Sequence, residues 1–281
     1  MMLSPRYEGP VIMSVDAPFD AQAVPCTRQR RRLESLLAGL TVEQWQIPSR
    51  CDGWSVADVV AHLVGVNAFW QLSVEMGRSG GPTKLLPGFD PAATPSQMVA
   101  GMGSLSGEDL LDQLVASNDG FLASFIGLDE EAWSLPAESP VGHVPIRLVV
   151  QHALWDAWVH ERDIALPLGL VPAEETDEVQ SCLVYAAVVS PALAFGLGCA
   201  VAGEFAVDAT DPATQFVMSV EDSVVVDAAH ARDAGPDTPC LRGSAVELIE
   251  ALSMRGPMPP SSPLEWTRLR DGLATAFDAI V

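Results

Sequence analysis

Basic residues are scarce in this sequence. Lysine and arginine together number 15, against 37 aspartate and glutamate residues, so the formal net charge is −22 at pH 7. Proteins that bind nucleic acids or anionic membrane surfaces draw much of their affinity from basic surface. We therefore expect neither a nucleic acid nor a membrane among the partners of this chain.

Long apolar runs and targeting signals are also missing. The longest apolar stretch, residues 186–202, is interrupted by Ser190, Pro191 and two glycines, whereas a membrane-spanning helix needs roughly 18 apolar residues. Residues 1–25 lack the basic start and apolar core of a secretory signal. These absences predict a cytoplasmic protein in which residues 1–25 form a disordered leader.

The cysteine pattern excludes two further classes, the disulfide scaffold and the thiolate zinc site. The five cysteines are odd in number, far apart and without a C-x-x-C pair. Cys51 precedes the tripeptide "DGW" and has no base nearby in the sequence. We therefore expect its side chain to be a packed loop thiol rather than a nucleophile.

The first part of the chain has the apolar spacing of helices. Apolar residues recur at steps of three and four in four segments: residues 27–40, 55–77, 108–126 and 145–166. Ser55 and Asp58 have the spacing of a capping box, and Pro145 suits a first helical turn. Residues 77–106 are rich in glycine and proline and indicate a loop. Four helices with one long loop predict a four-helix bundle over residues 26–168.

The second part of the chain has a different pattern. Residues 174–197 predict a helix that is interrupted near Pro191. Glu221 and Asp222 are expected at a hairpin turn between short alternating segments that predict strands: residues 205–209, 215–220 and 223–228. Two further helical segments follow. Residues 169–281 are thus predicted to form a smaller α+β domain, and the whole chain has a mixed fold of helices and sheet.

Three ionisable side chains occupy positions where the helical period expects apolar ones. His62 lies on the apolar stripe of the second predicted helix, and Asp156 and His160 lie four residues apart on the fourth. Residues at that spacing are neighbours on one helix face. A carboxylate and two imidazoles with one position left for solvent describe a catalytic site for zinc or a similar divalent metal.

Plainer interpretations exist for the same residues. A single histidine on an apolar face is usually a core residue with a satisfied hydrogen bond, and an aspartate–histidine pair on one helix is usually an intrahelical contact. His143 and His230 fall in predicted loops and are expected to face solvent. A basic run on the first helix is expected to be a solvated face, with binding of an anionic thiol as an alternative: Arg28, Arg30, Arg31 and Arg32.

Three stretches of the sequence resemble a known family. "LTVEQWQIPSRCDGWSVADVVAHLVG" (residues 40–65) and "WDAWVHERDIALPLG" (residues 155–169) are similar to the two signature stretches of the mycothiol-dependent maleylpyruvate isomerase family. "CLRGSAVELIEALSMRG" (residues 240–256) is similar to the C-terminal module found in that family. The resemblance implies a DinB-like metal-binding bundle at the N-terminus and covers most of the chain from about residue 27.

The resemblance also implies a cofactor and a set of ligands. It implies a divalent metal, usually zinc, held by His62, Asp156 and His160, with mycothiol as the cosubstrate thiol. Asp156 departs from the family pattern, which has glutamate at this position. Asp is one methylene shorter, so it must approach the metal more closely or bind through water.

Four further residues are assigned to the surroundings of this site. We expect Asp163 to accept a hydrogen bond from a metal-binding histidine. His152 lies four residues before Asp156 and is expected to hydrogen-bond to it, with metal binding by His152 as an alternative. Arg255 in "SMRG" is expected to face the cleft between the two domains and pair with a substrate carboxylate. Trp54 is expected at the mouth of the pocket, where it would contact the bound thiol.

These observations lead to one principal hypothesis with two rivals. The principal hypothesis is a metal-dependent enzyme, monomeric or homodimeric, that uses mycothiol to isomerise or S-conjugate a small electrophile. A non-catalytic relative that binds a metal or small molecule in a stress response is the first rival. The second is a metal-free carrier of hydrophobic ligands whose C-terminal domain does the binding.

Overall fold

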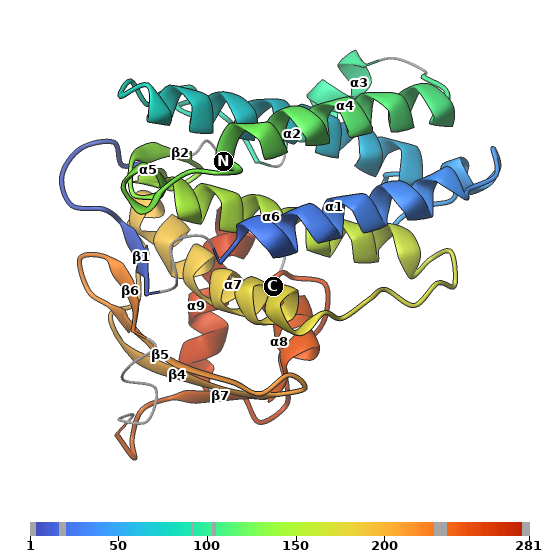
Figure 1. The fold of residues 1–281 in the computed structure, drawn as a ribbon. Coiled ribbons are helices and arrows are strands. Elements are labelled where there is room, and N and C mark those ends of the chain that lie inside the picture. The colour runs from blue at the N-terminus through green and yellow to red at the C-terminus, as the bar shows by residue number, and fades with distance from the viewer. Residues whose placement is uncertain (1–3, 17–20, 92, 103–104, 228–234, 277–281) are drawn as a thin grey trace.

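The computed structural model describes residues 4–16, 21–91, 93–102, 105–227 and 235–276. The N-terminal part of the chain is mainly helical (Figure 1). It consists of α1 (Ala23–Ala38), the 3-10 turn η1 (Gln44–Gln46), α2 (Val56–Arg78), α3 (Thr94–Gly101), α4 (Gly107–Phe125), α5 (Glu130–Trp133), the antiparallel hairpin of β2 (Pro136–Ser139) and β3 (Gly142–Pro145), and α6 (Ile146–Ala165).

The C-terminal part combines helices with a sheet. It consists of α7 (Thr176–Leu197), β4 (Gly203–Thr210), β5 (Thr214–Val220), β6 (Val224–Asp227), β7 (Cys240–Ser244), α8 (Ala245–Leu252) and α9 (Leu264–Ala276), and β1 (Met13–Val15) joins its sheet. The strand order is β1-β6-β5-β4-β7. Strands β4, β5 and β6 are antiparallel, whereas the two outer strands run parallel to their neighbours. The predicted arrangement of a helical part followed by a smaller α+β part is confirmed.

The four long helices of the N-terminal part are those that the apolar periodicity predicts. Helix α2 packs on α4 and α6, and α1 packs on the same two helices. Their shared core contains Leu33, Val59, Leu63, Leu114 and Ile164, all buried. The expected loop over residues 77–106 is wrong in part, because it contains the short helix α3, with Pro95 in its first turn. No residue of α3 is buried, so its sequence lacks the apolar spacing by which a helix is recognised.

The prediction of a disordered leader is contradicted within the described residues. The strand β1 pairs with β6 in register Met13 to Val224 and Val15 to Val226. Both Met13 and Val15 are buried, while Ser14 between them is exposed. An alternation of three residues is too short to be recognised in the sequence, and its partner strand lies far along the chain.

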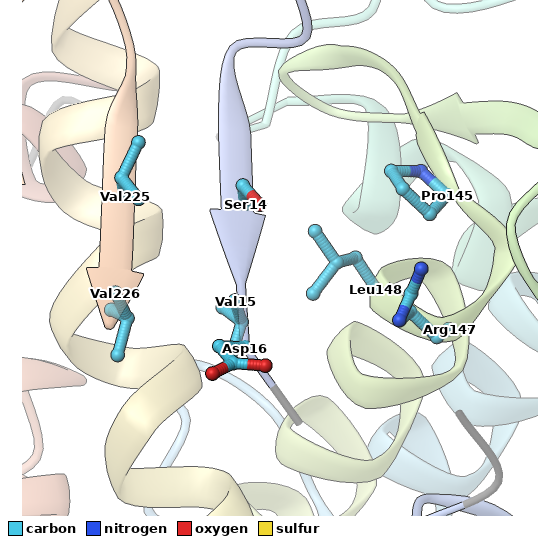
Figure 2. Close-up of a pocket in the computed structure, with 8 residues that line it drawn as sticks. All are labelled: Ser14, Val15, Asp16, Pro145, Arg147, Leu148, Val225 and Val226. Atoms are coloured by element: carbon cyan, nitrogen blue, oxygen red, sulfur yellow. The ribbon is translucent and has the colours of Figure 1, made fainter. Parts of the chain in front are cut away.

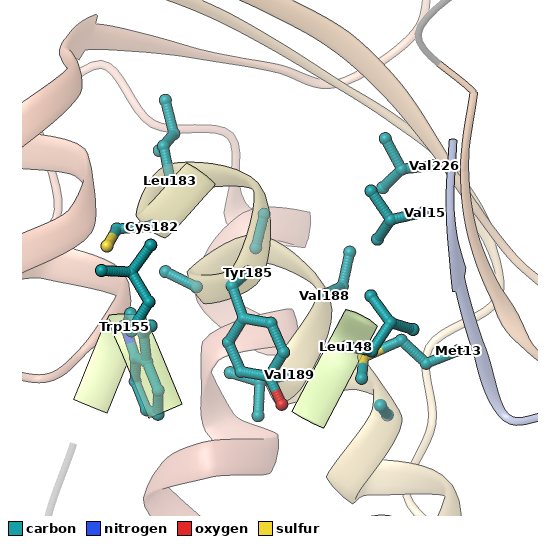
Figure 3. Close-up of a cluster of buried hydrophobic side chains, with 14 of the residues drawn as sticks. Met13, Val15, Leu148, Trp155, Cys182, Leu183, Tyr185, Val188, Val189 and Val226 are labelled. Atoms are coloured by element: carbon teal, nitrogen blue, oxygen red, sulfur yellow. The ribbon is translucent and has the colours of Figure 1, made fainter. Parts of the chain in front are cut away.

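Helix α7 connects the two parts of the molecule. It packs on α6 from the helical part and on the sheet and both C-terminal helices. Figure 3 shows Val188 of this helix between Leu148 of α6 and Val15 and Val226 of the sheet. The Tyr185 ring of the same helix lies 5.6 Å from the Trp155 ring of α6 between centroids. One continuous apolar core therefore runs through both parts.

The predicted interruption of α7 is wrong, because the helix continues through Pro191. By length and composition α7 is also apolar enough to cross a membrane, but most of its surface is buried inside the protein, as in a core helix. Helix α9 approaches α7 beside this proline, and a Cβ atom at Gly272 would overlap the carbonyl oxygen of Ser190. The two helices are also joined at this point by a hydrogen bond, because the N–H of Leu273 donates to Oγ of Ser190 at 3.2 Å.

Candidate metal centre

Helix α2 begins with the predicted capping box. The Ser55 side chain accepts a hydrogen bond from the Asp58 backbone N–H, and the Asp58 carboxylate accepts from the Ser55 N–H at 2.9 Å. The preceding loop folds back on this point through a bridge between Pro48 and Ser55. The start of the helix is therefore fixed, and its second turn presents His62 to α6.

The three sequence-predicted ligands lie together. The candidate ligand atoms of His62, Asp156 and His160 are all within 4.8 Å of one another. Nε2 of His160 is 3.7 Å from Oδ1 of Asp156, and the two imidazole rings are 5.0 Å apart between centroids. Two ligands of one zinc ion are at most about 4.4 Å apart, twice the bond length. Two imidazole nitrogens and a carboxylate oxygen at this spacing suit zinc after small side-chain movements.

The two histidines differ in their expected protonation. Burial and the neighbouring His160 lower the pKa of His62 to about 4, so its imidazole is neutral and able to bind a metal. Burial alone would lower the pKa of His160, but the hydrogen bond to Asp163 and the charge of Asp156 help raise it to about 10. In the metal-free protein His160 therefore carries a proton that a metal ion would have to displace.

Asp163 lies where the sequence predicts it. Its buried carboxylate accepts a hydrogen bond from Nδ1 of His160 at 3.0 Å. Burial opposes its ionisation, but His160 and Arg255 hold the pKa of this carboxyl well below its usual range. A carboxylate on Nδ1 fixes the histidine tautomer and leaves Nε2 free to face Asp156 and His62.

Arg255 reaches the same carboxylate from the C-terminal part. Its Nε and Nη2 donate to Asp163 at 2.9–3.0 Å. The end of α8 sets this position, because the N–H of Met254 bonds to the carbonyl of Ala251 and that of Arg255 to the carbonyl of Glu250. These two bonds form a Schellman motif. Met254 has the left-handed conformation (φ 59°) that glycine usually takes there. The expected cleft residue is thus present, but it is paired with a protein carboxylate.

Trp54 lies beside the candidate ligands, whereas His152 makes a hydrogen bond other than the predicted one. The Trp54 ring is 5.3 Å from the His62 ring between centroids, so it lies beside the candidate ligands. The expected hydrogen bond from His152 to Asp156 is wrong. Nδ1 of His152 is instead 2.6 Å from the hydroxyl of Tyr185, a residue of α7 whose position the sequence does not indicate. Burial lowers the pKa of His152 to about 4.

Cys51 lies beside the candidate ligands, a position that the sequence does not indicate. Its Sγ donates to Asp163 at 3.2 Å and lies 3.6 Å from Nδ1 of His160, so the fold brings to this loop thiol two groups that are distant in the sequence. Cys51, His160 and Asp163 also have the spacing of metal ligands. However, Nη2 of Arg255 is 3.5 Å from this sulfur and 2.9 Å from the carboxylate. The guanidinium already supplies the positive charge that a cation would bring there.

Two other expectations for histidines and arginines need correction. His143 is partly buried, with Nε2 2.8 Å from the carbonyl oxygen of Thr83, rather than facing solvent. His230 lies outside the described residues. The basic run on α1 is not a uniform solvated face, because Arg30 is only 2% exposed. Its guanidinium lies over the Phe121 ring and bonds to Asn67 and to the carbonyl oxygen of Ala153.

A separate cavity of about 340 Å³ lies between β1, β6 and the start of α6. Figure 2 shows Asp16 and Arg147 at its wall beside Leu148, Val225 and Val226. None of the candidate metal ligands lines this cavity. The candidate chemistry is therefore at the other end of α6, where His62, Asp156 and His160 meet.

Comparisons with known proteins agree with this geometry. Residues 26–165 match the sequence profile of the mycothiol maleylpyruvate isomerase N-terminal domain. The fold is similar to a crystal structure of the mycothiol-dependent maleylpyruvate isomerase and to one of its histidine-to-alanine mutant. In both comparisons the sequence identity is 17%, the TM-score is 0.60, and the match covers 87% of this chain and 97% of the other.

At this identity the structural match establishes a shared fold. No curated protein matches the sequence. The matched profile covers α1 through α6, the segment that carries His62, Asp156 and His160. The chain belongs to the mycothiol-dependent maleylpyruvate isomerase family.

Proposed function

We propose that this protein is a metal-dependent enzyme that uses mycothiol, or another low-molecular-weight thiol, to isomerise or S-conjugate a small electrophile. The observation that carries the proposal is the convergence of His62, Asp156 and His160 within 4.8 Å. These residues come from two helices inside a segment that matches an isomerase family. Maleylpyruvate is one member of the substrate class that the proposal covers.

The residues fit a divalent metal of borderline softness, and zinc is our first choice. His62, Asp156 and His160 would hold the ion. The chemistry that the bound ion would supply is stabilisation of a thiolate near neutral pH, and thiolate is the nucleophilic form of a thiol. Whether this thiolate isomerises or conjugates its electrophile depends on the substrate.

The residues around the ligands have separate tasks in this proposal. Asp163 holds Nδ1–H of His160, so that Nε2 points toward Asp156. Arg255 keeps the Asp163 carboxylate charged and fixed in orientation. Trp54 stacks beside His62 and shields one side of the site from water. The cluster is thus organised before any ligand binds.

The test begins with elemental analysis of the protein purified without chelator and without a histidine tag. We expect about one divalent ion per chain, and its loss in His62→Ala and in His160→Ala. Thiol-dependent turnover of maleylpyruvate and related electrophiles should be lost in parallel. His143→Ala is the control, since this histidine contacts Thr83 and lies outside the cluster.

The result also separates the rival functions. Stoichiometric metal without turnover of any thiol and electrophile pair would favour the non-catalytic binding protein. Absence of metal from the untagged wild-type protein, with no uptake of added zinc, would refute the proposal.

A further inference from the structure

The Arg50 side chain forms hydrogen bonds with the turn that carries Arg255. It lies in the loop before α2 and is partly buried. Its guanidinium binds both carboxylate oxygens of Glu250 on α8, with Nη1 3.1 Å from Oε1, and Nη2 donates to the carbonyl oxygen of Arg255 at 2.8 Å. A single side chain therefore holds both the last turn of α8 and the residue that follows it.

The same residue is also attached to α6. The Arg50 backbone N–H donates to the carbonyl oxygen of Asp163 at 3.1 Å. Nε of Arg162 donates to Oε1 of Glu250 at 2.7 Å, so Arg50 and Arg162 hold this carboxylate from two sides. The loop before α2, the end of α6 and the end of α8 meet at Glu250 and Asp163.

Geometry rather than charge distinguishes Arg50, because Arg162 already pairs with Glu250. Asp163 compensates Arg255, and Glu250 compensates Arg50, with Asp163 3.8 Å from Nε of Arg50 as a weaker partner. Only a planar guanidinium can bind a carboxylate with two nitrogens while also donating to a carbonyl group. Lysine would keep the charge of Arg50 and lose this geometry.

We propose that Arg50 is a positioning residue for the candidate metal centre. Through Glu250 and the carbonyl of Arg255 it holds the Arg255 guanidinium on Asp163, and through Asp163 it holds Nδ1 of His160. The consequences for activity rest on the proposed function. The geometric part of the proposal does not, because it concerns how the protein's own residues are held.

A double-mutant cycle tests the geometric part in the metal-free protein. The readout is the rate at which iodoacetamide alkylates Cys51, since Nη2 of Arg255 lies 3.5 Å from its sulfur and its displacement would open that side of the thiol to the reagent. Arg50→Lys and Arg255→Lys both preserve charge. We expect each to raise the rate about tenfold, and the double variant to react no faster than Arg255→Lys alone.

Two controls make the cycle specific. Alkylation of the exposed Cys199, followed in the same samples by mass spectrometry, should not change. Arg31→Lys is the matched variant, because Arg31 also pairs with two carboxylates but at the surface of α1. The proposal would be overturned if the increases in the Cys51 alkylation rate caused by Arg50→Lys and Arg255→Lys multiplied in the double variant. An unchanged rate in Arg50→Lys would also overturn it.

Kinetics then separate this proposal from the proposed function. If the wild-type protein binds zinc and turns over, Arg50→Lys and Glu250→Gln should change the same parameter, kcat or KM, as Arg255→Lys does. They should also shift the visible spectrum of the cobalt-substituted protein, which reports the orientation of the ligands. A wild-type protein without metal or turnover would refute the proposed function alone, and the alkylation cycle would still decide the role of Arg50.

Discussion

At the scale of single residues, Asp163 connects three parts of the chain. Its carboxylate accepts hydrogen bonds from His160, Arg255 and Cys51, and its backbone carbonyl accepts one from the backbone N–H of Arg50. The three side-chain donors depend on one acidic side chain that is fully buried. A buried carboxylate surrounded in this way orients its donors because no water competes for its oxygens.

Replacement of Asp163 by asparagine should therefore weaken metal binding. We expect zinc affinity to fall about 10- to 100-fold in Asp163→Asn, because the amide holds His160 less firmly and lowers its basicity. Competition with a chromophoric chelator measures this change. Asp177→Asn is the control, since Asp177 pairs with Arg28 at the surface. Equal affinities in the two variants would contradict the role assigned to Asp163.

His152 leads to a prediction about pH. Burial lowers its pKa from 6.5 to about 4. Between these two pH values the His152 imidazole is therefore mostly neutral in the folded protein and mostly protonated in the unfolded chain. Its contribution to stability is fully present above pH 6.5 and is lost as the pH falls toward 4. Between pH 7 and pH 5 this loss is about 2 kcal/mol.

Urea unfolding of the metal-free protein at the two pH values measures the effect. His152→Gln should remove about 2 kcal/mol of the difference in unfolding free energy between pH 7 and pH 5. Burial lowers the pKa of His62 as well, so part of the pH dependence should persist in His152→Gln. A pH dependence identical to that of the wild type would exclude His152 as a source.

At the scale of elements, helices α7 and α9 approach each other closely. Gly272 allows it, because a Cβ atom there would overlap the carbonyl oxygen of Ser190 and crowd Ala194. We expect Gly272→Ala to lower the free energy of unfolding by about 1–3 kcal/mol, since the helices would have to separate.

The matched control is Gly101→Ala at the end of α3, where a Cβ atom would meet nothing within 4 Å. Alanine should be neutral or slightly stabilising there, because it has the higher helix propensity. Chemical denaturation of both variants provides the comparison. A Gly272→Ala variant as stable as Gly101→Ala would mean that α7 and α9 are less tightly packed than the structure shows.

The elements also show what the sequence can predict and what it cannot. Helices α1, α2, α4 and α6 follow from apolar periods that involve only neighbours in the chain, and Ser55 gives the start of α2. Strand β1 and helix α3 carry too few periodic residues to be recognised. The Schellman turn at Met254 was not expected, because the sequence has no glycine at the left-handed position.

The same limit applies to the candidate site. The pair Asp156 and His160 is local to one helix, so its spacing reveals it, and His62 stands out as an ionisable residue on the apolar stripe of its own helix. Arg50 and Glu250 are 200 residues apart in the chain, and no local pattern predicts their contact. His152 was assigned to the nearest acidic residue on its own helix, but the fold offers it a hydroxyl from α7 instead.

At the scale of the whole molecule, the excess of acidic residues should govern the response to salt. A net charge of −22 destabilises the compact state through repulsion among surface carboxylates. Salt screens this repulsion over about 10 Å at 0.1 M. We expect the midpoint of thermal unfolding to rise by about 2 °C between 10 mM and 150 mM sodium chloride, about 1 kcal/mol in stability.

Differential scanning calorimetry at constant pH measures this rise. An equal rise with potassium chloride would show that screening rather than binding of a specific ion is responsible. A midpoint that falls with salt would show that the surface ion pairs, such as Arg31 with Asp119, outweigh the repulsion.

The first strand has a consequence for biosynthesis. β1 is synthesised about 210 residues before its hydrogen-bonding partner β6. At 5–20 residues per second this interval lasts roughly 10–40 s. During that time the helices of the nascent chain can assemble, but β1 cannot yet pair with β6. The sheet is therefore completed late in synthesis.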